Sequence, residues 1–464
     1  MRIFVDSKNT ANYIKELSGN SPNLNITENK INGISFRIIA FENMTNRELL
    51  TQGIINFILY CENKKFLCGK DLYKELFSGA FITSEKKEVD NIEDVYTALC
   101  SGFAAVAIDG MDKAIILGVQ GFMVKSIGEP TENAQIMGSK EGFTEAIKIN
   151  QTMVRRRIKS DKLRIEEFPI GSVSKTNCSL VYMSDRADMK TVDELRKRLK
   201  ERAADIILES GAVRIVADEH PSILFSQAVP EERPDALCQK IADGRIGIMI
   251  DGTPYSVIVP YLFKDHFNSL DDYSYKVGYA NIIRFLRYLA YAMAMLGSGV
   301  FVAVVKFHPH LIAGVWLDSI KEGLKGTPLG ITSEMLIILL IYETMREAGL
   351  RLPRPVGHTI SIVGSLIIGD AAVSGGLLSP AVVLVAALTS VASYMVPTLI
   401  DSTVPLRLVF VVAGGLFGLY GVGAVFLMYC ILVYSKKAYG VRYSKGIFKD
   451  IKPVRTSYAG NNRK

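Results

Sequence analysis

Two long runs without charged side chains, near the end of the chain, constrain its fold most strongly. Residues 371–400 contain no Asp, Glu, Lys or Arg, and neither do residues 408–435. Between Leu286 and Tyr434 only 15 of 149 residues carry one of these side chains. A membrane-spanning helix needs about 20 predominantly apolar residues. We therefore predict a C-terminal part that is embedded in a membrane.

The front half of the chain has the charge content of a soluble protein. The mean hydropathy of +0.21 thus averages a charged half and a strongly apolar half. The first residues, MRIFVDSKNTANYIKELSGN, contain no apolar core of signal-peptide length. We expect the front half to be cytosolic. The predicted fold class is an α/β cytosolic region of two related subdomains, followed by an all-α polytopic membrane domain.

A matched hairpin pattern indicates that the soluble half is duplicated. GFAAVAIDGMDKAIILG begins at Gly102 and GRIGIMIDGTPYSVIVP begins at Gly244, an offset of 142 residues. Both contain Asp-Gly between two β-rich runs, which is typical of a tight hairpin turn. Further β-rich runs lie at 35–42, 177–183 and 212–217, and residues 189–211 have the apolar spacing of a helix ending near Gly211.

These patterns predict five parts of the chain. They are an α/β subdomain over 1–137, a connecting helical segment over 138–169, a second α/β subdomain over 170–275, a transmembrane helical domain over 276–435 and a basic cytoplasmic tail over 436–464.

The membrane domain contains five apolar segments and a strong topological signal. The segments are 285–305, 331–348, 359–373, 380–396 and 408–434. The residues from Ser435 onward hold nine Lys or Arg and one Asp, so the positive-inside rule places this tail in the cytoplasm. A cytosolic front half then requires an even number of crossings. We favour four full crossings with one partly inserted element; alternatively the last segment turns at its glycines, over 414–423.

A few polar residues fall within these apolar segments. Charges at membrane depth are costly and usually face a bundle interior or a water-filled cavity. We expect Glu334 and Glu343 to face a pore and Arg346 to pair with Glu347; a cluster that only holds the helices together remains the alternative. The complete set of candidate pore or intramembrane polar residues is Glu334, Glu343, Arg346, Glu347 and Asp370.

Three consecutive arginines, Arg155, Arg156 and Arg157, are candidates for contacts between subunits or with lipid. A solvated helix face is the alternative. The chain contains no RNA-binding motif, and its net charge of +7 comes from the basic tail. We therefore predict no nucleic-acid partner.

The sequence offers no recognisable catalytic or metal-binding pattern. It lacks a Walker loop, G-x-G-x-x-G, G-x-S-x-G and H-E-x-x-H. His308 and His310 have no carboxylate partner at ligand spacing. We predict that the protein is not an enzyme and has no catalytic residues, no cofactor and no metal site.

Several motifs in order along the chain resemble the A subunits of GerA-type spore germinant receptors. They are EGFTEAIKINQTMVRRRIK (141–159), GSVSKTNCSLVYM (171–183), EERPD (231–235), GRIGIMIDGTPYSVIVP (244–260), FHPHLI (307–312), REAGLRLPRPVG (346–357) and IIGDAAVSGGLLSP (367–380). The resemblance covers about 138–443, and the first 130 residues match only in general layout.

The resemblance implies a function that composition does not. Such A subunits lie in the inner membrane of dormant spores and act with a transporter-like B subunit and a lipoprotein C subunit. They are expected to form a homo-oligomer, possibly a pentamer, and a ligand-gated channel that releases monovalent cations after a nutrient germinant binds. The alternatives are a similar protein of the SpoVA locus, which amplifies the signal, and a membrane transporter component; EERPD and IDGTP resemble the receptor branch more closely.

Overall fold

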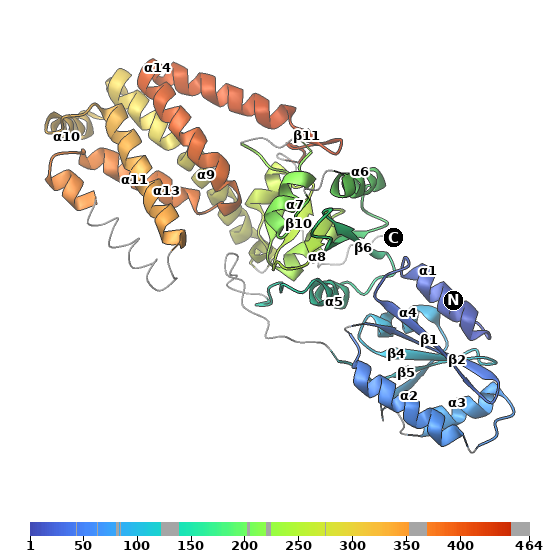
Figure 1. Ribbon diagram of the computed structural model, residues 1–464. Helices are drawn as coiled ribbons and strands as arrows, with labels where there is room; N and C mark the ends of the chain where they lie inside the picture. Colours follow the sequence, from blue (N-terminus) through green and yellow to red (C-terminus); the bar gives the residue numbers. More distant parts are fainter. Residues whose placement is uncertain are drawn as a thin grey trace. The chain divides into compact units, whose positions relative to one another are not determined.

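The computed structural model of the chain describes residues 1–42, 44–62, 64–79, 83, 85–121, 139–201, 205–219, 224–273, 275–351 and 369–446. The chain forms two compact units. We call Met1–Glu219 with Ala228–Tyr261 the N-terminal unit, and His220–Gln227 with Leu262–Lys464 the helical unit. Figure 1 shows the helices and strands of the two units.

The N-terminal unit contains two successive repeats of helices and strands. The first comprises α1 (Ser7–Leu17), β1 (Leu24–Ile31), β2 (Ile34–Phe41), α2 (Arg47–Cys61), α3 (Gly69–Ser78), β3 (Lys86–Val89), α4 (Ile92–Leu99), β4 (Ala104–Ile108) and β5 (Ala114–Leu117). The second comprises α5 (Ile147–Arg157), β6 (Leu163–Ile170), β7 (Thr176–Met183), α6 (Met189–Glu201), α7 (Ser210–Ala217), β8 (Val229–Glu231), α8 (Pro234–Ala242), β9 (Ile246–Ile250) and β10 (Ser256–Val259).

The two sheets have the same strand order. The first is β1-β2-β4-β5-β3 and the second is β6-β7-β9-β10-β8, so equivalent strands occupy equivalent places. The repeated hairpins predicted from the sequence are β4–β5 and β9–β10, both antiparallel. Their turn glycines, Gly110 and Gly252, have φ of 88° and 90°, a conformation that favours glycine. The predicted α/β region of two related halves is confirmed.

The turn aspartates of these hairpins also hold a helix. Oδ1 of Asp109 accepts a hydrogen bond from the backbone N of Ser7, the first residue of α1, at 2.9 Å. Oδ1 of Asp251 accepts one from the backbone N of Ile147, the first residue of α5, at 3.0 Å. Because the first N–H groups of a helix have no intrahelical acceptor, each aspartate acts as a distant helix cap.

The first sheet is covered on both faces. Side chains alternate along β2, so Phe36 and Ile38 pack with α2 and α3, while Ile39 and Phe41 pack with α1 and α4. Figure 1 shows these two helix pairs on opposite sides of the sheet. A strand buried on both faces reads as a continuous apolar run, which explains the sequence ISFRIIAF.

Two segments of the N-terminal unit differ from expectation. Residues 212–217 were predicted to be β-rich, but they lie in α7, whose buried residues Val213 and Ala217 are one turn apart. Over 138–169 the sequence predicted a helical connection. In this segment Asp251 caps the start of α5 by accepting a hydrogen bond from its first backbone N–H. The strand β6 is an edge strand of the second sheet and pairs with β7. Both elements therefore belong to the second repeat.

The helical unit consists of apolar helices and short connections. They are η1 (Phe263–Phe267), η2 (Leu270–Tyr273), α9 (Val277–Phe307), η3 (Pro309–Leu311), α10 (Gly314–Lys325), α11 (Ile331–Arg351), α13 (Pro380–Ser393), η4 (Pro397–Leu399), α14 (Ile400–Ser435), β11 (Lys437–Ala438) and β12 (Val441–Arg442). Of the predicted membrane segments, 359–368 lies outside the described residues, as do residues 447–464 of the tail. The prediction of helices after the α/β region is confirmed.

Two helices of the described residues are long and apolar enough to cross a membrane. They are Gly278–Phe307, with 30 residues, and Pro397–Ser435, with 39 residues; Pro380–Ser393 is a shorter apolar helix. The second contains a break at Gly418, whose φ of 64° and ψ of −149° are not helical.

The chain folds back on itself at Gly418. A Cβ atom added at Gly421 would lie 2.4 Å from the carbonyl oxygen of Ala413, eight residues earlier. In a continuous helix such residues are about 12 Å apart along the axis. In Figure 1 the two limbs of α14, 400–417 and 419–435, leave the bend in different directions.

Contacts along α9 give the direction of the two limbs. The end of α9 reaches the bend, because a Cβ atom at Gly418 would lie 3.2 Å from Phe307. Nearer the start of α9, the hydroxyl of Tyr291 is 3.0 Å from that of Tyr429 on the second limb. Ser402, at the start of the first limb, and Lys436, after the second, donate to the carbonyl oxygens of Leu224 and Phe225. Both ends of α14 therefore lie at the end of the bundle where α9 begins.

Candidate functional site in the helical unit

A cluster of charged side chains joins three helices inside the helical unit. Oε1 of Glu343, on α11, accepts a hydrogen bond from Nη2 of Arg407, on α14, at 2.7 Å. Its Oε2 lies 2.8 Å from Nη2 of Arg346, one turn further along α11. Nη1 of Arg407 also donates to Oγ of Ser390, on α13, at 3.1 Å. One carboxylate thus holds two guanidinium groups, and the cluster is net positive.

Arg407 is the most deeply buried member of this cluster, with 1% of its side chain exposed. Within the described part of the chain, no atom accepts a hydrogen bond from Nε of Arg346 or of Arg407. Glu343 therefore supplies the compensation that a buried cation requires. Sequence reasoning missed Arg407, although it is the one charged residue over 402–435, which is itself a signal of function or of a buried partner.

Glu334 has a different environment and is completely buried. Its Oε1 accepts from Oγ1 of Thr327 at 2.5 Å, and its Oε2 accepts from the backbone N of Ser379 at 2.8 Å. Ser379 directly precedes α13, so the carboxylate lies at the positive end of that helix. These contacts favour the interhelical alternative for Glu334, and its pore-facing role stays a prediction.

Glu347 and Asp370 are exposed side chains. We expected Arg346 to pair with Glu347, but in the structure Arg346 pairs with Glu343. Glu347 pairs instead with Arg351, at 2.6 Å, where 56% of the glutamate side chain and 79% of the arginine side chain are exposed. The predicted polar residues therefore separate into a buried group and an exposed group.

The three consecutive arginines of α5 do not form one patch. The guanidinium of Arg155, 2% exposed, lies 4.2 Å from the centre of the Phe41 ring and donates to Oγ of Ser21 at 3.0 Å. Phe41 and Ser21 belong to the first repeat, so Arg155 joins the two repeats through hydrogen bonding and a cation–π contact. Its contact with lipid or another subunit stays a prediction, and burial argues against it.

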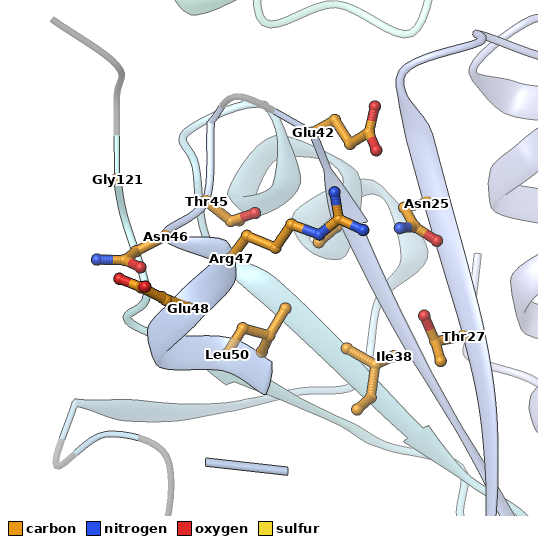
Figure 2. Close-up of a pocket in the computed structure, with 11 residues that line it drawn as sticks. Asn25, Thr27, Ile38, Glu42, Thr45, Asn46, Arg47, Glu48, Leu50 and Gly121 are labelled. Carbon is orange, nitrogen blue, oxygen red and sulfur yellow. The ribbon is translucent and has the colours of Figure 1, made fainter. Parts of the chain in front are cut away.

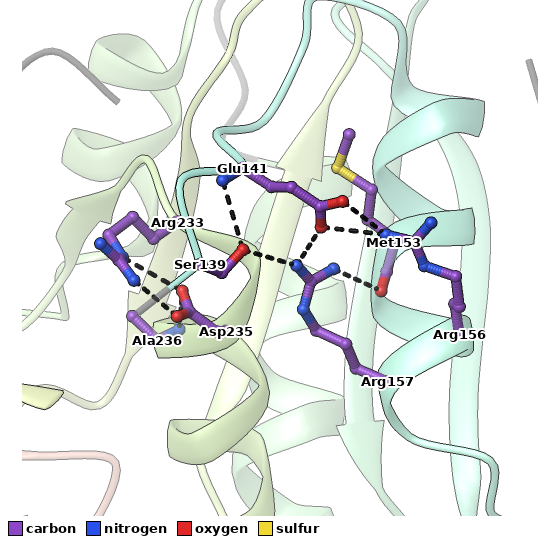
Figure 3. A network of polar contacts seen from close by, with 8 residues as sticks. All are labelled: Ser139, Glu141, Met153, Arg156, Arg157, Arg233, Asp235 and Ala236. Atoms are coloured by element: carbon purple, nitrogen blue, oxygen red, sulfur yellow. Dashed lines mark hydrogen bonds and ion pairs between the residues drawn. The ribbon is translucent and has the colours of Figure 1, made fainter. Parts of the chain in front are cut away.

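Arg156 and Arg157 both bind Glu141 (Figure 3). Arg156 donates to the two carboxylate oxygens of Glu141 at 2.8 and 2.9 Å. Burial opposes ionisation of this carboxyl, but the hydrogen bonds from the two arginines lower its pKa below the ordinary value. The contacts of Arg156 and Arg157 between subunits remain predictions.

The motif EERPD (231–235) connects the end of β8 to the first residues of α8. Arg233, 2% exposed, donates to the two oxygens of Asp235 at 3.1 and 2.6 Å, as Figure 3 shows. Pro234 begins the helix, a position where its missing N–H costs nothing. Burial raises the pKa of Glu231 to about 7, while the backbone N of Arg233 donates to its Oε1 at 3.2 Å. Glu231 therefore titrates near neutral pH.

A pocket of about 580 Å³ lies in the first repeat, beside β1, β2 and the start of α2. Figure 2 shows Arg47 between Glu42 and Asn25, with Ile38 and Leu50 at the opposite end. Its volume is in the range of small-molecule sites. Arg47 and Glu48 are exposed, so water screens their charges, and we assign no ligand to it.

Among the described residues, no group of three or more His, Cys, Asp or Glu side chains could hold a metal ion. The rings of His308 and His310 are 5.9 Å apart. The prediction that the chain is not an enzyme stays a prediction.

The described chain thus combines a duplicated α/β unit with a bundle of apolar helices, two of which are long and apolar enough to cross a membrane. The family model described as Bacillus/Clostridium GerA spore germination protein matches residues 12–455. The chain belongs to the GerA family of spore germination proteins, and the resemblance drawn from its motifs is confirmed.

Three relatives illustrate the family. Spore germination protein KA of Bacillus subtilis (strain 168) is 32% identical over 442 residues, which cover 94% of this chain and 80% of that protein. Spore germination protein GerLA of Bacillus cereus is 33% identical over 357 residues, which cover 76% of this chain and 72% of that protein. The uncharacterized membrane protein YfkQ of Bacillus subtilis (strain 168) is 30% identical over 449 residues, which cover 93% of this chain and 86% of that protein.

One solved structure is also similar. It is the crystal structure of the N-terminal domain of the A subunit of the Bacillus megaterium spore germinant receptor GerK3. The match has a TM-score of 0.44 and 28% sequence identity, and it covers 57% of this chain and 98% of that chain.

Proposed function

We propose that the chain is the A subunit of a nutrient germinant receptor in the spore inner membrane. It assembles with a transporter-like B subunit and a lipoprotein C subunit. It forms a homo-oligomer, a pentamer in the simplest case, that couples germinant sensing to the release of monovalent cations as a ligand-gated channel. The carrying observation is the ion pair between Glu343 and Arg407, buried between apolar helices of a GerA-family chain.

The bend at Gly418 supports a topology of six crossings. Each limb of α14 is about 25 Å long at 1.5 Å per residue, close to the roughly 30 Å hydrocarbon thickness of a bilayer. Together with α9, α11, α13 and segment 359–373, the two limbs give an even number. The N-terminal unit and the basic tail are then on the same, cytoplasmic, side.

The two environments of the acidic residues support a division of roles. Glu343 and Glu334 are engaged by side chains or backbone of neighbouring helices, so we propose that they hold the bundle and its gate in one arrangement. Glu347 and Asp370 are exposed, so in an oligomer they can line a cation pathway. Rings of acidic side chains select cations in other channels.

Cation release from spores tests this proposal. Spores that contain this chain and its partner subunits as their one germinant receptor are compared with spores that carry Glu347→Gln and Asp370→Asn together. We expect the double variant to release potassium more slowly after nutrient addition at unchanged receptor abundance. Unchanged release would refute the assignment of these two carboxylates to the pathway.

A matched substitution tests the other role. Glu343→Gln leaves two guanidinium groups without their carboxylate, and breaking a buried ion pair costs roughly 3 kcal/mol. We expect a lower melting temperature of the detergent-purified chain. Glu347→Gln, in an exposed pair, is the control and changes stability by roughly 0.5 kcal/mol or less. Equal melting temperatures for the two variants would contradict the role of Glu343.

Two other functions compete with this one. The broken helix α14 resembles the discontinuous helices of transporters, whose breaks form substrate sites. A protein of the SpoVA type would amplify the germination signal without sensing a nutrient. Proteoliposomes with the purified chain and its partners separate these cases. Nutrient-gated potassium flux supports the channel, accumulation of a substrate supports a transporter, and activity that requires no nutrient supports the SpoVA-type role.

A further inference from the structure

Helix α10 presents an apolar edge that no described part of the chain covers. None of its residues is buried. Val315 and Trp316 are 84% and 72% exposed, and the preceding Phe307 and Leu311 are 43% and 59% exposed. We call these four residues the α10 edge. Exposed large apolar side chains that follow one another closely along the chain indicate a contact surface.

The C-terminal half of the same helix face packs on the bundle. Leu324 packs against the apolar cluster that contains Val302 and Val382. A Cβ atom added at Gly323 would lie 3.4 Å from Pro380, so α10 lies close to the start of α13. The C-terminal half of α10 is therefore fixed, and Trp316, two turns earlier on the same face, extends beyond this contact.

The charged residues of α10 lie on the side of the helix away from Trp316. They are Asp318, Lys321, Glu322 and Lys325. At 3.6 residues per turn, Lys325 projects from the side of the helix opposite Trp316. A helix with an apolar edge containing Trp and a polar side containing Lys is typical of a segment that lies in the membrane–water interface.

The position of α10 along the chain agrees with this chemistry. It follows α9, which contains the 30-residue candidate span Gly278–Phe307, after a short connection, and the bend of α14 at Gly418 contacts the end of α9. Phe307 at the end of α9 and Leu311 continue into Val315 and Trp316. The α10 edge is thus a continuation of the apolar surface of a candidate membrane span.

We propose that α10 lies in the lipid–water interface, at the membrane face where α9 ends. Trp316 contacts the outer part of the acyl chains, and Lys321 and Lys325 face the phosphates of the lipid headgroups. This inference rests on the proposed membrane insertion of the helical unit and on no channel activity. In this position α10 fixes the depth of the connection between α9 and α11 in the bilayer.

The chain contains a single tryptophan, so the fluorescence of the full-length protein reports on this site alone. The purified chain is reconstituted into vesicles of phosphatidylcholine and phosphatidylglycerol whose acyl chains carry bromine either near the headgroup or near the terminal methyl. We expect emission at shorter wavelength than in urea. Bromine near the headgroup should quench Trp316 about twofold or more, and bromine near the methyl should quench it less.

Two variants provide matched controls on the same helix. W316F/K325W moves the tryptophan to the opposite, charged side, where iodide in the aqueous phase should quench it and brominated lipid should not. W316F/I320W moves it to Ile320, which is partly buried, where both quenchers should act weakly. Iodide quenching of Trp316 as strong as that of W316F/K325W would overturn the proposal. Protection of Trp316 from both quenchers would also overturn it, because a second protein surface would then cover the edge.

Flotation separates this inference from the proposed membrane function. If the chain fails to float with vesicles after alkaline carbonate treatment, membrane insertion of the helical unit is refuted. If the chain floats and Trp316 remains accessible to iodide, only the interfacial position of α10 is refuted.

Discussion

In each repeat of the N-terminal unit, one aspartate links the last hairpin to the first helix. Asp109 and Asp251 were recognised in the sequence as hairpin-turn residues, and the turns at Gly110 and Gly252 confirm this. Their second role, capping α1 and α5, was not predictable. The capped residues lie 102 and 104 positions away, so no local pattern connects them. Local turn chemistry can be predicted from neighbours in sequence; a distant hydrogen bond requires the fold.

Substituting either aspartate should destabilise the start of the one helix that it caps. We expect Asp109→Ala to increase amide hydrogen exchange in α1 and Asp251→Ala to increase it in α5, with a loss of about 1 kcal/mol each, as for other helix caps. Hydrogen–deuterium exchange of the full-length chain, read by mass spectrometry, measures this. Asp112→Ala, at an exposed position of the same loop, is the control. Faster exchange spread equally over both repeats would contradict separate caps.

Glu231 should make stability depend on pH. Burial raises its pKa to about 7 in the folded protein, above the ordinary value of 4.5. The folded state therefore holds a proton that the unfolded state has released. Stability should fall as pH rises from about 4.5 to about 7 and then stay level with respect to this group.

The matched variant is Glu231→Gln, which resembles the protonated side chain and cannot ionise. Its melting temperature should fall less than that of the natural chain over the same pH range, measured by thermal unfolding in detergent. Parallel pH profiles for the two proteins would show that Glu231 does not titrate in this window.

The charged residues of α11 could be identified from sequence because charges are rare within apolar segments. Their pairing was harder to predict. Adjacent residues of a helix point about 100° apart, so Arg346 faces Glu343, three residues earlier, rather than Glu347. Arg407 comes from a helix 64 positions away from Glu343, and only the packing of α14 on α11 brings the two together.

At the scale of elements, apolar content was a better guide than β propensity. The run AVRIVA (212–217) contains β-branched residues yet forms α7, because packing of Val213 and Ala217 on one side of a helix overrides intrinsic preference. Strands β2 and β7 were predicted correctly, since their long apolar runs are buried. The bend in α14 was one of two alternatives that the glycines of 414–423 left open.

Gly418 should be essential to this bend. Its φ of 64° with ψ of −149° is a conformation open almost exclusively to glycine, and a non-glycine residue there costs about 1–3 kcal/mol. A Cβ atom would also lie 3.2 Å from Phe307. We expect Gly418→Ala to lower the melting temperature in detergent. Gly423→Ala, in the same helix with no atom within 4 Å of the added Cβ, should leave it unchanged or raise it.

At the scale of the whole molecule, charge segregation was sufficient to divide the chain into an α/β region and a helical region. The number of crossings was not derivable in the same way, because hydropathy measures how apolar a segment is and not where it turns. The limbs of α14 read as one apolar segment in sequence, and the structure separates them at a single residue.

Six crossings predict which positions share a membrane face. In a chain without its natural cysteines, single cysteines are introduced at Lys8, His310 and Lys437. In sealed inverted vesicles, a membrane-impermeant maleimide should label the variants at Lys8 and Lys437 and leave the variant at His310 unlabelled until the vesicles are opened. Labelling of His310→Cys together with Lys437→Cys in sealed vesicles would exclude this topology.

The distant caps of the N-terminal unit have a consequence for biosynthesis. Each repeat is completed by a hydrogen bond between its first helix and its last hairpin, 102 and 104 residues further along. At about 5–20 residues per second, a ribosome takes roughly 5–20 s to make such a stretch, longer than many small domains need to fold. The rate of translation therefore limits the rate at which each repeat completes its fold. The second repeat becomes complete only as synthesis approaches Val277, so the last hairpin of the N-terminal unit and the long apolar helix α9 leave the ribosome almost together.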